Sequence, residues 1–238
     1  MKINLNEMEV ITEDGFESVP DNSTKTKNTE VFFRNIEGNL INKIKNHDIC
    51  LGCIAWLTSP LVLSALSETE TQIVVQKEDF LRPDIGAHHK TWPKWLREKY
   101  DDLSNLLERH EFPYLGLFSV GSDPGIEGVR CVGNHNKDKN PAFPRMHNKF
   151  MVFAERQKKF VNDPPYEGYW HDFVVPCAVW TGSFNFTKNS SNSLENALYI
   201  TDPDIVKAYF SEYQQIAALS EPLDWTTPWS APEWRIGT

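Results

Sequence analysis

The sequence predicts an α/β fold in which a mixed sheet is flanked by helices, and three observations support this. Residues 50–57 form a continuous apolar run, as expected for a strand covered on both faces. A helix then begins, because Ser59 can cap it and Pro60 suits its first turn. Residues 71–76 return as the next strand, which makes a βαβ unit with parallel strands and a right-handed crossover.

The other elements follow from local patterns along the chain. Residues 1–28 are polar and predict a flexible lead-in, residues 31–33 predict a short strand, and residues 36–44 predict a helix. Residues 80–112 predict an insertion with one long helix, whose apolar spacing continues to Leu107. Strands are then predicted at 114–120, 128–132, 149–153, 174–180 and 194–200, and a closing helix at 203–219. We therefore expect one domain over 29–220, followed by a proline- and tryptophan-rich arm at 221–238 that packs on its own domain or on a partner subunit.

Composition narrows the class of protein. A chain of 238 residues with 40% hydrophobic content can bury a core, and 12% aromatic residues argue against disorder. No apolar stretch is long enough for a signal peptide or a membrane-spanning helix. Four cysteines do not suggest a disulfide framework. We expect a soluble cytoplasmic protein without membrane association.

The charge is unevenly distributed. The formal net charge is −9, which disfavours a generic nucleic-acid binder. Residues 129–160, however, hold eight basic and two acidic residues, so this stretch carries 8 − 2 = +6. A basic centre beside an acidic C-terminal part is typical of a protein that admits a polyanion at one place, and a solvated charged loop is the alternative interpretation.

Two short polar patterns predict a phosphate-sized anion site. His147 and Lys149 are two residues apart in a predicted strand, so they point to the same side. Ser183 and Asn185 repeat this spacing, and Gly182 before them lets the backbone approach closely. A nucleophile or base, a fixed positive charge and two neutral donors together suit a phosphoryl group.

In this order, the His-x-Lys, Gly-Ser-x-Asn and Glu-Asn patterns resemble the phospholipase D superfamily, and most closely its small bacterial nuclease-like members. The resemblance covers about residues 30–219 and implies a phospholipase D-like sheet flanked by helices. It implies that His147 attacks phosphorus or protonates the leaving oxygen, and that Lys149 and Asn185 hold the non-bridging oxygens. Ser183 would add a hydrogen bond, and Glu195 would orient the imidazole. No metal and no cofactor is expected, because lysine and amide donors spread the developing charge.

One position departs from the family pattern. Ala154 stands five residues after Lys149, where the family usually has aspartate. That aspartate is generally regarded as structural, so the departure suggests a rearranged turn before a long loop at 155–173.

The chemistry needs two histidines, because one forms the phosphohistidine and the other transfers protons to the leaving group and from water. A second set within the chain could involve His88-His89-Lys90 with Gly121-Ser122, but Pro93 after it excludes a central strand. We therefore expect a homodimer with the active site on its two-fold axis, where both copies of His147 meet.

Further residues are candidates for substrate binding. Arg145 and Arg130 belong to the basic centre, and Lys90 and Trp92 belong to a basic and aromatic cluster that could stack bases. The alternative for that cluster is the start of a helix with core tryptophans. Cys50 and Cys53 lie an odd number of residues apart in a strand, which favours structural cysteines on opposite faces. Cys131 with His135 lacks the second pair that a zinc site would need.

The function expected from these observations is a metal-independent nuclease that cleaves DNA through a phosphohistidine, with DNA favoured over RNA. Two alternatives remain, a phospholipase and a catalytically degenerate nucleic-acid-binding scaffold of the same fold. The acidic surface also suggests a larger partner protein that delivers the substrate. An exposed apolar stripe or basic amphipathic helix, which a phospholipase should show, is not evident in the sequence.

Overall fold

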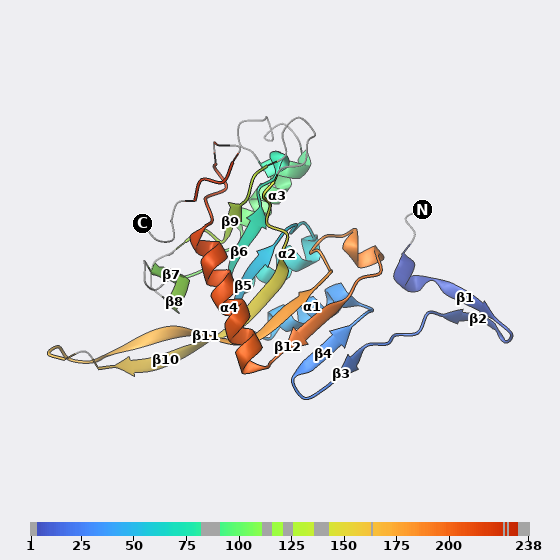
Figure 1. The fold of residues 1–238 in the computed structure, drawn as a ribbon, viewed down its shortest axis with the longest axis horizontal. Helices are drawn as coiled ribbons and strands as arrows, with labels where there is room; N and C mark the ends of the chain where they lie inside the picture. Colours follow the sequence, from blue (N-terminus) through green and yellow to red (C-terminus); the bar gives the residue numbers. More distant parts are fainter. Residues whose placement is uncertain are drawn as a thin grey trace.

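A mixed sheet forms the centre of the molecule (Figure 1). The computed structural model describes residues 4–81, 91–110, 116–120, 126–135, 143–162, 164–225, 227 and 229–232. Within these residues the sheet has ten strands, of which eight follow the order β3-β4-β12-β11-β10-β5-β6-β9. Strand β8 pairs with β11 and with β7. The strands are β3 Thr24–Lys25, β4 Thr29–Phe32, β5 Ile49–Ile54, β6 Glu70–Gln76, β7 Leu107–His110, β8 Gly116–Val120, β9 Val129–Val132, β10 Lys149–Val161, β11 Tyr169–Gly182 and β12 Ala197–Ile200.

The strand directions confirm the predicted mixed α/β fold. Strands β5, β6 and β9 run parallel, and helix α2 (Pro60–Leu66) connects the first two. The predicted cap is present, since the Ser59 hydroxyl accepts a hydrogen bond from the backbone of Val62 at 3.3 Å. Strands β10, β11 and β12 run antiparallel to their neighbours.

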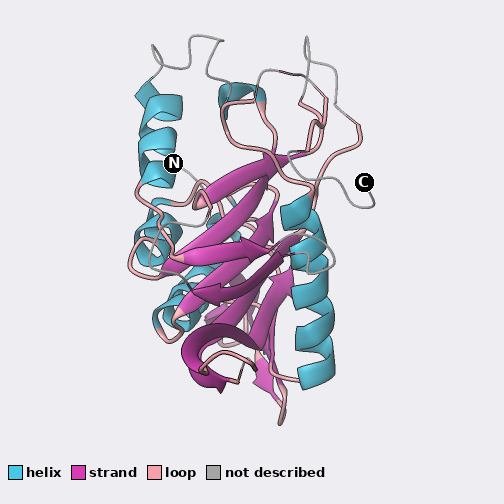
Figure 2. Cartoon of the chain, turned by 90° about the vertical axis from the view of Figure 1, so that its left-hand side faces the viewer, coloured by secondary structure: helices cyan, strands magenta, loops and turns pink. Residues whose placement is uncertain are grey.

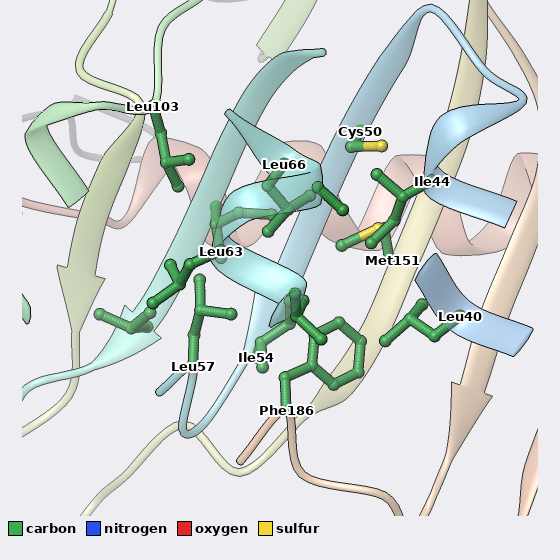
Figure 3. Close-up of a cluster of buried hydrophobic side chains, with 14 of the residues drawn as sticks. Leu40, Ile44, Cys50, Ile54, Leu57, Leu63, Leu66, Leu103, Met151 and Phe186 are labelled. Atoms are coloured by element: carbon green, nitrogen blue, oxygen red, sulfur yellow. The ribbon is translucent and has the colours of Figure 1, made fainter. Parts of the chain in front are cut away.

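Helices cover both faces of the sheet (Figure 2). Helices α1 (Ile36–Lys45), α2 and α3 (Thr91–Asp101) pack on one face, and α4 (Pro203–Ala218) packs on the other. Strand residues alternate between the two resulting cores. Leu40, Ile44, Leu63 and Met151 meet in the first core (Figure 3), whereas Phe150, Val152 and Ala154 face the second.

Cys50 and Cys53 follow this alternation and lie in different cores, as predicted, so they cannot share a ligand. Both thiols are fully buried, and burial raises their pKa, that of Cys50 to about 12. Among the described residues, no helix is long and apolar enough to cross a membrane.

Three segments differ from the sequence-based predictions. The prediction of a loop at 155–173 is wrong, because β10 and β11 continue through most of this segment as an antiparallel ribbon (Figure 1). The long helix expected within 80–112 is shorter, since α3 ends at Asp101 and Leu107 begins β7. The polar lead-in contains a turn of 3-10 helix (Leu5–Glu7) and the hairpin of β1 (Glu9–Thr12) and β2 (Gly15–Ser18). The ribbon was not predicted because aromatic residues such as Phe160 and Trp170 are exposed in it. Its sequence therefore lacks the alternation of apolar and polar residues that indicates a strand with one buried face.

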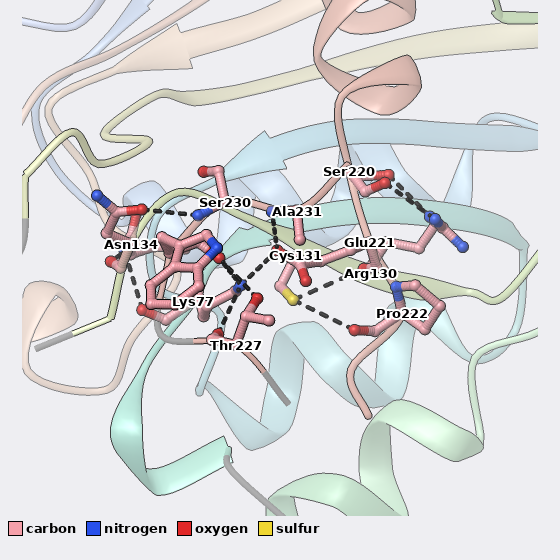
Figure 4. Close-up of polar contacts among 12 residues, drawn as sticks. Lys77, Arg130, Cys131, Asn134, Ser220, Glu221, Pro222, Thr227, Ser230 and Ala231 are labelled. Carbon is pink, nitrogen blue, oxygen red and sulfur yellow. Dashed lines mark hydrogen bonds and ion pairs between the residues drawn. The ribbon is translucent and has the colours of Figure 1, made fainter. Parts of the chain in front are cut away.

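The described part of the C-terminal arm packs on its own domain, around Lys77 (Figure 4). The Lys77 ammonium is fully buried, forms an ion pair with Glu221 and donates to the carbonyls of Thr227 and Trp229 at 3.3 and 3.0 Å. It also lies 4.7 Å from the ring centre of Trp225. One buried cation thus holds the start of the arm against the carboxyl end of β6.

Candidate active site

The predicted motifs meet at one edge of the sheet because of strand direction. His147 lies just before β10, and Ser183 lies just after β11, which runs antiparallel to it. On the other side of β10, Lys149 pairs with Ile54 at the end of β5. The Asn148 carbonyl accepts a hydrogen bond from the backbone of Ala55 at 2.8 Å, which fixes the segment that carries the histidine.

His147 and Lys149 are brought into direct contact. The Lys149 Nζ atom lies 3.3 Å from both ring nitrogens of His147 and donates to the His147 carbonyl at 3.1 Å. The histidine is exposed, whereas the lysine is half-buried. An imidazole open to solvent beside a lysine is suited to binding an anionic group.

Trp56 and Glu78 complete this edge, and the sequence-based analysis missed both. The Trp56 ring meets the His147 ring edge-on, with centres 5.4 Å apart and an interplanar angle of 83°. Its Nε1 atom donates to Glu78 at 2.8 Å. Both residues lie two positions beyond the ends of neighbouring parallel strands, and that position was the available signal. The hydrogen bond fixes the indole, and the indole limits the rotation of the imidazole.

Ser183 is held between the chain ends of β11 and β12. Its hydroxyl donates to the Glu195 carboxylate and accepts from the backbone of Asn196 at 3.1 Å. Gly182 is needed here, because a Cβ atom at this position would lie 2.2 Å from the Asn196 carbonyl oxygen. Within the described residues no hydrogen bond joins Glu195 to His147, so the contact that the resemblance implies is not formed in this chain by itself.

Asn185 contributes an amide whose Oδ1 atom is buried and lacks a hydrogen-bond partner among the described residues. Buried polar atoms are nearly always paired, so this amide is available to form a hydrogen bond with a further group. A half-turn of the amide places its NH₂ donors at the same point.

Electrostatics favour the neutral form of His147. The pKa of His147 is lowered from its ordinary value by burial, then by the charges of Lys149 and Arg145. Burial also lowers the pKa of Lys149, and the charge of Glu195 opposes that shift. Since the charge of Glu195, just before β12, acts on Lys149 at the start of β10, these two strand ends belong to one electrostatic site.

The residues expected to bind substrate lie in different places. Arg145 is half-buried and close enough to lower the pKa of His147, so it lies beside the site. Trp92 is exposed and packs on Phe80 with ring centres 5.1 Å apart. It lines an open hollow of about 400 Å³ with Trp95 and Lys188. Lys90 falls outside the described residues, as do His88, His89 and residues 121–125.

Arg130 corrects the sequence-based prediction. Its side chain is 1% exposed, pairs with Glu127 and donates to the Ser220 hydroxyl at 2.7 Å (Figure 4). A guanidinium buried in this way serves the fold and is not placed to meet a substrate.

Nor does the basic stretch at 129–160 form one surface. Arg156 pairs with Glu70, and Lys158 and Lys159 lie on the distant part of the ribbon. Cys131 and His135 are buried, and His135 packs against Trp225 with ring centres 4.9 Å apart. Folding therefore separates charges that are adjacent in sequence.

Ala154 lies away from this site. It is fully buried in the second core and pairs with Ile49 at the opposite end of β5 from Lys149's partner. The sheet register shifts between Phe153 and Ala154. An aspartate there would enter an apolar core, so alanine suits this local structure.

Part of the chain matches a known domain family, and most of it matches one viral protein. The family model described as "Cardiolipin synthase, PLD-like domain" matches residues 127–217, which include every residue of the two polar patterns. The uncharacterized protein L381 of Acanthamoeba polyphaga mimivirus is 29% identical over 237 residues, which covers 94% of this chain and 74% of the viral protein.

Two solved structures are similar over most of the chain. Nuc from Salmonella typhimurium, described as a phospholipase D family member, is 16% identical, with a TM-score of 0.45 and coverage of 81% of this chain and 97% of Nuc. NucT from Helicobacter pylori is 14% identical, with a TM-score of 0.48 and coverage of 82% and 98%.

Proposed function

We propose that this chain is a member of the phospholipase D superfamily, because a family model described as a PLD-like domain matches residues 127–217. We propose further that it is a metal-independent phosphodiesterase that cleaves DNA. One observation carries the proposal. His147 and Lys149 at the start of β10 meet Ser183 and Asn185 beyond the end of β11, at a single open edge. This set supplies a nucleophile, a cation and neutral donors, which are the groups that phosphoryl transfer requires.

In the first step, a ring nitrogen of neutral His147 attacks phosphorus, and a P–N bond forms as the P–O bond to the leaving oxygen breaks. Lys149 and Asn185 donate to the non-bridging oxygens, where charge develops. A second histidine protonates the leaving oxygen, then takes a proton from the water that hydrolyses the phosphohistidine.

Ser183 and Glu195 change partners in this scheme. In the free chain the serine hydroxyl donates to the carboxylate. A phosphate oxygen draws that donor away, which leaves Glu195 free to accept a hydrogen bond from the far N–H of the imidazole. The carboxylate then fixes the ring orientation during attack.

The second histidine is the His147 of another copy of the chain. His147 is exposed, and it is the histidine that the described residues place beside Lys149. A two-fold dimer brings two such edges face to face, and each chain then supplies one half of the site.

Nucleic acid is favoured as substrate by the surroundings of the edge. Arg145 supplies further positive charge. The hollow lined by Trp92 is also lined by Lys188, which lies three residues after Asn185 in the sequence. Exposed aromatic faces beside a lysine suit unpaired bases and their phosphates. We propose that the protein cleaves DNA in preference to RNA.

The first test is cleavage of single- and double-stranded DNA and RNA in excess EDTA, with phosphatidylcholine vesicles as the lipid arm. We expect the wild type to cut DNA and His147→Ala to be inactive, whereas His171→Ala, on the distant ribbon, keeps full activity. Metal-dependent cleavage, or equal activity in His147→Ala, would overturn the mechanism. Lipid hydrolysis alone would assign the phospholipase function, and DNA binding without cleavage would assign the scaffold.

Mixing experiments test the shared site. When wild type is one quarter of all chains and is co-refolded with His147→Ala, a site needing two histidines leaves about one sixteenth of the activity of the all-wild-type sample. A site complete in one chain leaves about one quarter.

A further inference from the structure

A cluster of side chains that could bind a metal ion lies at the other end of the sheet from the candidate active site. His47 in the turn between α1 and β5, Glu155 on β10 and Cys177 on β11 place their ligand atoms within 4.8 Å of one another. Strand β5 separates this cluster from the candidate active site by roughly 17 Å, at 3.3 Å per residue. None of the three residues takes part in the proposed reaction.

The sheet irregularity aims Cys177 at the histidine. Phe153 pairs with Ala178 and Ala154 with Pro176, so Cys177 is the extra residue of a β-bulge. Bulges re-aim side chains and are retained as specific features. The Cys177 sulfur lies 3.6 Å from Nδ1 of His47.

That separation fits a bridging ion. Zinc binds imidazole nitrogen at about 2.0–2.1 Å and thiolate sulfur at about 2.3 Å, so tetrahedral geometry holds the two atoms about 3.6 Å apart. The observed distance is the same.

The imidazole is oriented for ligation through Nδ1. Its Nε2 atom lies 3.0 Å from the Tyr199 hydroxyl, and its ring stacks on Phe153 with centres 4.7 Å apart. A hydrogen bond from the far nitrogen fixes the tautomer of metal-binding histidines.

Negative charge gathers around the thiol. The carboxylates of Glu155 and Asp48 are both close enough to act on the Cys177 thiol. The neutral thiol donates weakly to the Phe153 carbonyl at 3.4 Å. A divalent cation would offset both carboxylates and convert the thiol to a bound thiolate.

We propose that His47, Glu155 and Cys177 bind a zinc-type divalent cation, with water as the fourth ligand. The ion joins the α1–β5 turn to the base of the β10–β11 ribbon. Its role is structural, so it is independent of the proposed cleavage reaction, which continues in EDTA.

The test is titration of the full-length, untagged chain with Co²⁺, followed by displacement with Zn²⁺. We expect one equivalent of Co²⁺ to produce a near-ultraviolet thiolate-to-cobalt absorption band, and Zn²⁺ to abolish it. Cys177→Ser should lose the band, and Tyr199→Phe should weaken affinity about 10- to 100-fold. His147→Ala and His171→Ala are the matched controls and should bind normally.

Glu155→Gln is a second variant that should fold normally, because Glu155 is exposed and the substitution preserves the size of the side chain. It should weaken Co²⁺ affinity while the circular dichroism spectrum is unchanged. The proposal is overturned if saturating Co²⁺ gives no thiolate band, if Cys177→Ser retains it, or if Glu155→Gln binds as tightly as the wild type.

Discussion

Replacing Lys77 by methionine should destabilise the fold strongly, because it leaves a carboxylate buried without its cation. The ammonium is fully buried and pairs with Glu221, whose side chain is only 7% exposed. It also holds the Thr227 and Trp229 carbonyls. Methionine fills a similar volume, so the change removes charge and hydrogen bonds more than packing.

The magnitude follows from the loss of one partner of a buried ion pair, which costs about 3–5 kcal/mol. For a chain of this size each kcal/mol lowers Tm by about 2–4 °C, so the expected fall is roughly 6–20 °C. Lys94→Met is the matched control. The Lys94–Glu98 pair is solvent-exposed at 3.8 Å, and its loss should cost at most about 0.5 kcal/mol.

Urea unfolding followed by circular dichroism measures the effect as a lower midpoint with an unchanged m-value. The double variant Lys77→Met/Glu221→Leu should recover most of the loss, because it removes the stranded carboxylate. A loss below about 1 kcal/mol in Lys77→Met, or no recovery in the double variant, would refute a buried, coupled pair.

Three further predictions concern the candidate active site. Burial and the charges of Lys149 and Arg145 lower the pKa of His147, so the neutral nucleophile persists to lower pH. Arg145→Gln should raise that pKa and move the acidic limb of the kcat/KM profile to higher pH. An acidic limb that does not move would contradict this coupling. Gly182→Ala should reduce cleavage at least about tenfold, since the new Cβ forces the β11–β12 connection apart, and wild-type rates would show that the close approach is not needed. Trp56→Phe keeps an aromatic ring against the imidazole but loses the hydrogen bond to Glu78. We expect kcat to fall about 10- to 100-fold with little change in Tm. An unchanged kcat would mean that Trp56 only packs against the imidazole.

Local patterns predicted the strands and helices that are long, apolar and clearly capped. The β5–α2–β6 unit was confirmed in position and direction because its strand is buried on both faces and its cap is chemically specific. The β10–β11 ribbon was missed because both of its faces are largely exposed, and hydrophobic periodicity reports only burial.

For the site, the sequence supplied His147, Lys149, Ser183 and Asn185, since strand alternation alone places each pair on one side. The position of Trp56 beyond a strand end was a signal in the sequence. Its contact with the imidazole was not predictable, because that contact depends on which strand lies next to β10.

The sequence by itself thus determined the α/β class, the βαβ unit and the chemical groups of the candidate site, because these depend on neighbouring residues and their period. Tertiary structure alone decided the fate of the charged residues. Arg130 and Lys149 lie in the same basic stretch, yet one is buried in the fold and the other lies at the open edge. Whether a charge is paired inside or presented to a substrate depends on contacts between distant segments, such as Arg130 with Ser220, and no local pattern encodes those contacts.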